Sequence, residues 1–383
     1  MSEIDPIVIV GIARTPQGSL LGVFKDITAL QLGSIAIKAA VERAKLSPKQ
    51  ITDVFMGCVL TAGLGQAPAR QASLAAGLPV SIPCTTINKM CASAMQAVMI
   101  AHDNLLANPE NIIVAGGMES MSHAPYLVPK ARVGYRLGHG ALLDHMLWDG
   151  LEDAYEAGRP MGYFAELCAQ EYGLTRQQQD DYARTSLLRT KQADFSQEIV
   201  AVNGITQDEH PYKVNIEKIP SLKPVFLKDG TITAASSAAI ADGASALVMM
   251  RLSLAKKRGI KPIAKIIGYS SYATLPAQFP TAPIHVIKQL LKNHHWNIDK
   301  VDLFEINEAF ATVALAAMKD LFISHEKLNI HGGSCALGHP IGATGTRIIA
   351  TLISALQQRK LKRGIASLCI GGGEATAVAI EML

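Results

Sequence analysis

The feature that most constrains the fold of this 383-residue chain is an internal repeat. The segment Asp53–Gly57 resembles Asp302–Ile306, and Ile113–Glu119 resembles Leu368–Glu374, in the same order along the chain. One such match would be chance, but several in one order indicate two copies of a single structural unit. We expect the copies to pack together, so that a site at their junction draws residues from both.

The spacing inside the two copies supports this interpretation. Cys91 lies 38 residues after Asp53, and His339 lies 37 residues after Asp302. The two residues that most resemble catalytic groups therefore stand at equivalent places in the two copies.

Short apolar runs alternate with helical patterns in both copies. Such runs are typical of strands in a sheet that helices cover on both faces, so the sequence predicts an α/β fold. Six runs are predicted to be strands: Ile7–Val10, Asp53–Val59, Asn111–Ala115, Pro262–Tyr269, Asp302–Ile306 and Ala366–Ile370.

A stretch of different character separates the copies. It is rich in turn residues and mixed charge, and it includes a helical segment near Thr175–Ala193. Thr175 is predicted to cap that helix, because Gln178 follows three residues later. We interpret the stretch as an insertion, which divides the chain into a first half (1–118), an inserted loop domain (119–250) and a second half (251–383).

Composition excludes several classes of protein. A formal net charge of only +4 does not favour a nucleic-acid partner. The six cysteines are scattered and form no Cys-x-x-Cys pair, which argues against a disulfide framework or a zinc site. No apolar run approaches the roughly 20 residues that span a bilayer, and the acidic start of the chain has no basic leader character. We expect a cytoplasmic protein without a membrane or metal partner.

Cys91 is the first candidate for chemistry. It follows the apolar, β-branched run Cys84–Ile87 and precedes the small-residue helical run Ala92–Ala101. A strand-to-helix junction places the sulfur at a helix N-terminus, where the dipole favours a thiolate and backbone N–H groups can receive an oxyanion. A lone cysteine in such a run is more often an inert buried residue, so this motif alone decides nothing.

Three further candidates follow in the second half. His339 lies in a glycine-rich segment between Gly338 and Pro340, where the backbone can approach a ligand closely. Cys369 ends an apolar run and precedes three glycines, at the end of a strand where α/β sheets place ligands. Asn307 follows another such run. Together they offer a nucleophilic thiol, a base for it, and a second thiol that could move a proton at carbon.

These segments resemble the thiolase family from end to end and in the family's order. The resemblance implies the five-layered α-β-α-β-α thiolase fold, built from two similar halves with an inserted loop domain. The matching segments are Asn88–Ser93, Gly116–Ser122, Gly230–Ala234, Asn307–Phe310, Gly338–Gly345 and Cys369–Gly373.

The resemblance also implies an activity, acetyl-CoA C-acetyltransferase. This is a reversible ping-pong Claisen condensation of two acetyl-CoA molecules to acetoacetyl-CoA and CoA. Cys91 resembles the nucleophile that becomes acetylated, and His339 the residue that takes its proton. Cys369 resembles the acid/base at C2 of the second substrate. The N–H groups of Cys91 and Gly371 resemble one oxyanion hole, and His339 with a water held by Asn307 resembles the other.

Binding residues are implied less directly. Lys213 and Lys218 resemble basic positions near the CoA nucleotide, although as bare sequence they are more often surface lysines. The residues implied to line the CoA and acyl pocket are Ala234, Ser237, Ala238, Met161, Phe226, Phe279 and Phe310.

Two positions depart from the family pattern. Pro160 stands before Met161-Gly162 where the family often has His, and Ala238 stands where a pantetheine-contacting Ser is usual. The segment Met121–Gly150 resembles a tetramerisation loop and implies a homotetramer. Acetyl-CoA, acetoacetyl-CoA and CoA are implied as substrates and products, with no separate cofactor.

Other functions stay open at this point. A 3-ketoacyl-CoA thiolase of broader chain-length range would carry the same motifs, and so would a CoA-binding relative without catalysis. A decarboxylating ketoacyl synthase or a hydroxymethylglutaryl-CoA-type synthase would lack a cysteine at the position of Cys369.

Overall fold

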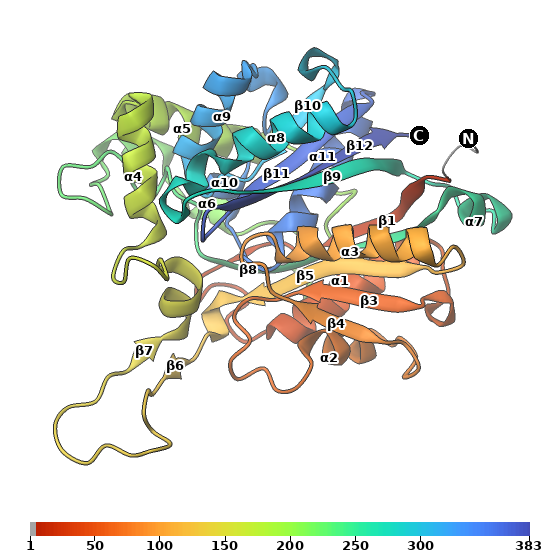
Figure 1. The fold of residues 1–383 in the computed structure, drawn as a ribbon, viewed down its shortest axis with the longest axis horizontal. Coiled ribbons are helices and arrows are strands. Elements are labelled where there is room, and N and C mark those ends of the chain that lie inside the picture. The colour runs from red at the N-terminus through yellow and green to blue at the C-terminus, as the bar shows by residue number, and fades with distance from the viewer. Residues whose placement is uncertain (1–4) are drawn as a thin grey trace.

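The computed structural model describes residues 5–383 and is dominated by one ten-stranded sheet (Figure 1). Its strands lie in the order β10-β11-β12-β9-β1-β8-β5-β3-β4, with the short β2 (Gly18–Ser19) paired to β8 beside this path. The sheet consists of two similar parts that meet where β1 pairs with β9 over two residue pairs.

The first half of the chain builds the part of the sheet ordered β1-β8-β5-β3-β4. Its three central pairings are β3 parallel to β5, β5 antiparallel to β8, and β8 antiparallel to β1. Its elements are β1 (Ile7–Arg14), α1 (Ala29–Arg43), β3 (Asp53–Gly57), α2 (Pro68–Ala75), β4 (Cys84–Ile87), α3 (Ser93–Ala107), β5 (Ile113–Ser120) and β8 (Ala241–Arg251).

The second half repeats this order as β9-β12-β11-β10, with the same parallel and antiparallel pairings. Where β4 stands in the first half, Leu328 makes a single parallel bridge to Phe304. The repeat expected from the sequence is therefore confirmed in the topology. The elements are α7 (Leu252–Lys257), β9 (Ala264–Ala273), α8 (Ala282–Asn293), β10 (Leu303–Ile306), α9 (Ala311–Leu321), α10 (Ser334–Leu337), α11 (Thr344–Arg359), β11 (Arg363–Ile370) and β12 (Glu374–Met382).

Five layers result from this pairing of halves. Helices α1 and α2 cover the outer face of the first part of the sheet, and α8 and α9 cover the outer face of the second. Helices α3 and α11 lie between the two parts and share one apolar cluster with strands of both. Residues 344–356 of α11 are buried on every side, which is typical of a helix enclosed between two sheets.

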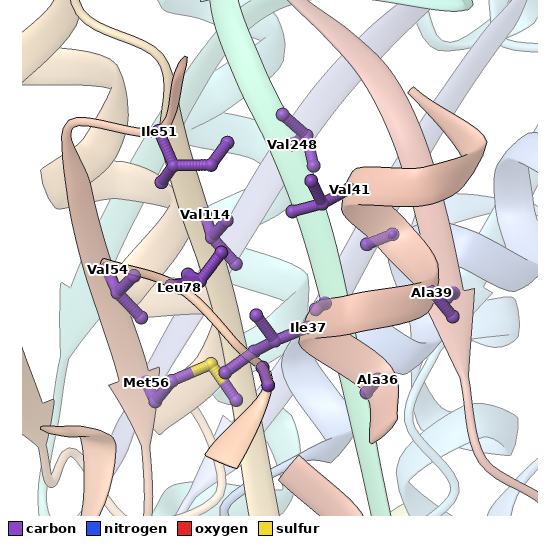
Figure 2. Close-up of a cluster of buried hydrophobic side chains, with 14 of the residues drawn as sticks. Ala36, Ile37, Ala39, Val41, Ile51, Val54, Met56, Leu78, Val114 and Val248 are labelled. Atoms are coloured by element: carbon purple, nitrogen blue, oxygen red, sulfur yellow. The ribbon is translucent and has the colours of Figure 1, made fainter. Parts of the chain in front are cut away.

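The apolar cluster between α1 and the sheet of the first half follows from the sequence pattern of α1. Thr28 caps α1 with a capping box that includes Gln31, which fixes where the helix begins. The apolar side of α1 then faces the sheet, and Figure 2 shows Ile37 and Val41 beside Val114 and Val248 of β5 and β8. These side chains are less than 3% exposed, so each contributes roughly 1.5–3 kcal/mol of burial free energy.

The segment between β5 and β8 forms the insertion. Thr175 caps α5 through a capping box with Gln178, as predicted. The hairpin of β6 and β7 projects as an arm from the body of the molecule (Figure 1). The elements are β6 (Tyr126–Leu127), β7 (Leu143–Asp144), the π-helical turn η3 (Leu147–Leu151), α4 (Met161–Tyr172), α5 (Arg176–Gln192), α6 (His210–Lys213) and the 3-10 turn η4 (Ile216–Ser221).

The predicted limits of the insertion, 119–250, are wrong at both ends. Glu119 and Ser120 continue β5, and residues 241–250 form most of β8, which pairs with β1 and β5 in the first half's sheet. Residues 241–250 are mostly apolar because β8 is buried on both faces. Nothing local in the sequence indicates which strands such a segment pairs with. Among residues 5–383, no helix is both long and apolar enough to cross a lipid bilayer.

A glycine in α11 sets the distance between the two middle helices. A Cβ atom on Gly345 would lie 2.2 Å from the backbone nitrogen of Met95 in α3. We expect Gly345→Ala to push the helices apart and lower the free energy of unfolding by about 1–3 kcal/mol. Urea denaturation would measure the loss, with Gln357→Ala on the exposed part of α11 as the control. Equal stability of the two variants would contradict the proposed close contact.

Candidate active site

Cys91 lies on a tight turn between β4 and α3. Met90, just before it, has a φ of 46°, a left-handed conformation that is uncommon for a residue with a side chain. The Ser93 hydroxyl accepts a hydrogen bond from Lys89 N at 2.9 Å and donates one to Met90 O at 2.6 Å. These bonds hold the turn and present the Cys91 sulfur at the N-terminus of a 15-residue helix.

The Cys91 sulfur faces two backbone donors, the N–H of Gly371 and its own N–H. Burial raises the pKa of the Cys91 thiol to about 11, and these two donors offset part of that rise. Cys369 is buried beside it: burial raises the pKa of Cys369 well above its ordinary value, and the neighbouring Cys91 adds to the effect. The structure thus brings one thiol from each half close together, both in the protonated form.

Gly371 belongs to a glycine turn that joins β11 to β12. Gly372 and Gly373 have φ values of 95° and 88°, which favour glycine. A Cβ on Gly373 would also lie 2.5 Å from the Thr274 carbonyl oxygen. The turn can therefore approach both its neighbours and the Cys91 sulfur closely.

His339 precedes α11, as Cys91 precedes α3. Its Nδ1 is 2.6 Å from the Thr344 hydroxyl, which donates its own proton to Pro340 O at 3.0 Å. Thr344 must therefore accept from Nδ1–H, which leaves Nε2 without a proton. Burial, with a smaller effect from the Arg347 charge, lowers the pKa of His339 to about 3. The imidazole is neutral and offers the Nε2 lone pair as a base.

Asn307 lies against that lone pair. Its Nδ2 is 3.4 Å from His339 Nε2, and its Oδ1 accepts from the Ser334 hydroxyl at 2.5 Å. Arg347 donates to Ser334 Oγ at 2.8 Å and lies 3.7 Å from the Glu305 carboxylate. This buried chain of bonds orients the Asn307 amide so that its Nδ2 faces His339 Nε2.

Two buried carboxylates, for which the sequence alone predicts no role, support these loops. Glu119 accepts from the backbone N–H groups of Val59, Leu60 and Gly342 at 2.8–3.1 Å, so it ties loops of both halves together. Burial raises the pKa of Glu119 to about 7, and those three donors counteract the rise.

Glu308 does the same beside Asn307. Its carboxylate accepts from Tyr182 and Ser186 of α5, and from the backbone N–H of Cys335 in α10. It therefore fixes the inserted segment to the loop that carries His339. In the sequence, Glu119 and Glu308 could have been noticed as charged side chains at the ends of apolar strands. They lie inside the segments Gly116–Ser122 and Asn307–Phe310.

Most of the implied acyl-pocket residues form one group that reaches Gly371. Met161 lies against Gly371: a Cβ there would be 3.4 Å from the Met161 sulfur. Phe226 makes an edge-on contact with Phe310 at 5.6 Å between ring centroids, and Phe279 lies 6.5 Å from Phe310.

The segment that includes Ser237 and Ala238 runs beside this aromatic group. Ser237 bridges to Phe310, and Ala238 N donates to Ala309 O at 3.0 Å. The next residue, Ala239, accepts from His339 N at 2.8 Å. The segment therefore connects the aromatic group to His339.

The remaining implied binding residues lie farther along the inserted segment. Ala234 lines a cavity of about 110 Å³ together with His210, Ile219 and Leu222. Lys213 in α6 is half exposed and forms an ion pair with Glu209, and Lys218 in η4 is exposed. No contact joins either lysine to Cys91, His339 or Cys369 among the described interactions of residues 5–383.

Comparison with known proteins agrees with this geometry. Residues 7–253 match the family model "Thiolase, N-terminal domain", and residues 260–382 match "Thiolase, C-terminal domain". An acetyl-CoA acetyltransferase of Schizosaccharomyces pombe is 46% identical over 97% of this chain and 98% of its own. A cytosolic acetyl-CoA acetyltransferase of Gibberella zeae is 42% identical over 100% of both chains.

A solved structure shows the same likeness. The Acat5 thiolase from Ascaris suum, crystallised in complex with coenzyme A, superposes with a TM-score of 0.94 at 39% identity, over 99% of this chain and 100% of its own. The two-copy topology, the five layers and the family models that together cover nearly the whole chain place this protein in the thiolase family.

Proposed function

We propose that this protein is an acetyl-CoA C-acetyltransferase, which condenses two acetyl-CoA molecules to acetoacetyl-CoA and CoA and catalyses the reverse thiolysis. The observation that carries the proposal is that Cys91 of the first half and Cys369 of the second lie close enough for Cys91 to affect the pKa of Cys369, with the Gly371 N–H as a backbone donor to the Cys91 sulfur. Full-length relatives named acetyl-CoA acetyltransferase support the choice of substrate.

In the first half-reaction, His339 Nε2 takes the Cys91 proton as the sulfur attacks the acetyl-CoA carbonyl carbon. The N–H groups of Cys91 and Gly371 hold the developing oxyanion, which is the largest contribution that such a site makes. The carbon–sulfur bond to CoA breaks, and Cys369 gives its proton to the leaving sulfur. Acetyl-Cys91, a Cys369 thiolate and a protonated His339 remain.

In the second half-reaction, the Cys369 thiolate removes a proton from C2 of another acetyl-CoA. Protonated His339 and a water held by Asn307 donate to the enolate oxygen, because a thioester α-carbon is too weak an acid for a thiolate alone. The enolate carbon attacks acetyl-Cys91, the Cys91 sulfur leaves, and it recovers its proton from His339. All three residues return to their initial state.

The protonated resting state fits this sequence of steps. Burial favours two thiols and a neutral imidazole, so charge forms only when substrate binds and the backbone donors can hold it. Both reactants are thioesters, so the reaction as proposed uses no separate cofactor.

Assembly and location are further proposals. We infer a homotetramer, supported by apolar side chains such as Val133, Leu137 and Leu142 that are exposed on the projecting hairpin arm. A cytoplasmic location is supported by the name of the Gibberella zeae relative, whereas a relative from Bos taurus is named mitochondrial.

Replacing the two thiols separately tests their roles. Cys91→Ser should abolish acetylation of the protein by acetyl-CoA, since the nucleophile is lost. Cys369→Ala should still become acetylated on Cys91 but should neither exchange the α-protons of acetyl-CoA nor condense. Mass spectrometry of the intact protein and deuterium exchange measure the two steps. Normal condensation by Cys369→Ala would exclude the role assigned to that residue.

The raised pKa of Cys91 predicts its response to pH. A thiol with a pKa of about 11 gains thiolate tenfold per pH unit, so alkylation of Cys91 by iodoacetamide should rise about tenfold per unit from pH 7 to 9. A thiolate already paired with a charged His339 would instead react at a constant rate over this range. Peptide mapping separates Cys91 from the other five cysteines.

The side chain of Met161 is expected to limit the acyl chain, because it lies against Gly371. Met161→Ala should raise kcat/KM for 3-ketohexanoyl-CoA relative to acetoacetyl-CoA by about tenfold. Met318→Ala, a partly buried methionine of the same apolar cluster, serves as the control. An unchanged ratio for Met161→Ala would place the limit on chain length elsewhere.

A further inference from the structure

An ion pair joins the turn that carries Cys91 to the end of the glycine turn that carries Gly371. Lys89 Nζ contacts Glu374 Oε2, with exposed fractions of 25% and 38% for the two side chains. Lys89 lies two residues before Cys91 in the first half, and Glu374 lies three residues after Gly371 in the second. The catalytic scheme above uses neither side chain.

The backbone of Lys89 is part of the turn that presents Cys91. Its N–H donates to Ser93 Oγ at 2.9 Å, and its carbonyl accepts from Ala92 N at 3.0 Å. These two hydrogen bonds close the turn of residues 89–93, which contains Cys91. A displacement of Lys89 would therefore move the Cys91 sulfur with it.

Glu374 stands at the other end of the contact. It pairs with Ile370 across β11 and β12, so the two residues close the turn made of Gly371, Gly372 and Gly373. Three glycines carry no side chains that could anchor the turn to the opposite half. Thr274 N donates to Gly373 O at 2.7 Å and fixes the turn to β9's loop, which belongs to the same half.

We propose that the Lys89–Glu374 ion pair is a positioning device that holds the glycine turn of Gly371 beside the turn of Cys91 across the junction of the halves. An oxyanion-hole donor acts only at hydrogen-bond distance, so a shift of either loop would remove its effect. The effect of the ion pair on acetylation of Cys91 rests on the acyl transfer proposed above. Its effect on the position of the Cys91 thiol does not depend on that function.

Folding and positioning can be separated experimentally. Ion pairs with this degree of exposure contribute little to stability, so loss of the pair should change the melting temperature by less than about 4 °C. Lys265 and Glu381 form an ion pair of similar exposure at the far end of β12, with a separation of 2.8 Å. Lys265→Gln is therefore a matched control.

The experiment compares Lys89→Gln, Glu374→Gln, the double variant Lys89→Glu with Glu374→Lys, and Lys265→Gln. Two rates are measured in the full-length protein: alkylation of Cys91 by iodoacetamide at several pH values, and acetylation of Cys91 by acetyl-CoA. We expect each single variant to lower both rates by roughly tenfold, a part of the loss seen when an oxyanion-hole donor is removed. The exchanged pair should recover most of the loss, and Lys265→Gln should match the unaltered protein.

Three results would overturn the positioning role. Opposite effects of Lys89→Gln and Glu374→Gln would show that Lys89 acts by its charge alone. Unchanged rates in both would show that the contact does not hold the turn, and failure of the exchanged pair to recover would deny the pairing. If the unaltered protein is not acetylated by acetyl-CoA, the proposed function fails, while alkylation still decides the positioning proposal.

Discussion

The close contact of α3 with α11 is the constraint on which the rest of the structure depends. Gly345 touches the backbone of Met95, and a Cβ on Gly117 would lie 2.0 Å from Gly342 O, just before α11 begins. Side chains at these positions would separate the halves. Because the two helices meet near their N-termini, the turns that carry Cys91 and His339 lie at one junction, and each half completes a site that neither could form alone.

The same junction determines the electrostatics. Burial at the junction of the two halves disfavours the charged forms of the Cys91 and Cys369 thiols and of the His339 imidazole, and so shifts the pKa of each. Several buried charged side chains are held by ion pairs or hydrogen bonds. Arg14 of β1 binds Glu198 and Asp208 of the inserted segment at 2.6–3.0 Å, and Glu119 and Glu308 receive several N–H or O–H donors. These buried side chains hold loops together through hydrogen bonds.

Much of the fold followed from local patterns. Short apolar runs in the sequence predict buried strands such as β3 and β10. The capping box of Thr175 and Gln178 predicts the start of α5. The limits of the insertion did not follow, because the apolar run that forms β8 carries no mark of its partners. In the site, Cys91, His339, Cys369 and Asn307 stood out by their places at strand ends and glycine turns. Glu119 did not, because its importance lies in donors from Val59 and Gly342, which only the folded chain brings to it.

The amino-acid order by itself determined that the chain contains two copies of one α/β unit, and that Cys91 and His339 stand at equivalent places in the two copies. Periodicity, capping and glycine turns are local properties, so they can be read without a fold. Tertiary structure alone decided that His339 is neutral, with its proton on Nδ1, and that the Gly371 N–H lies on the Cys91 sulfur. The protonation of His339 and the position of the Gly371 N–H depend on burial and on contacts between residues far apart in the chain. The packing of the two halves creates this burial and these contacts.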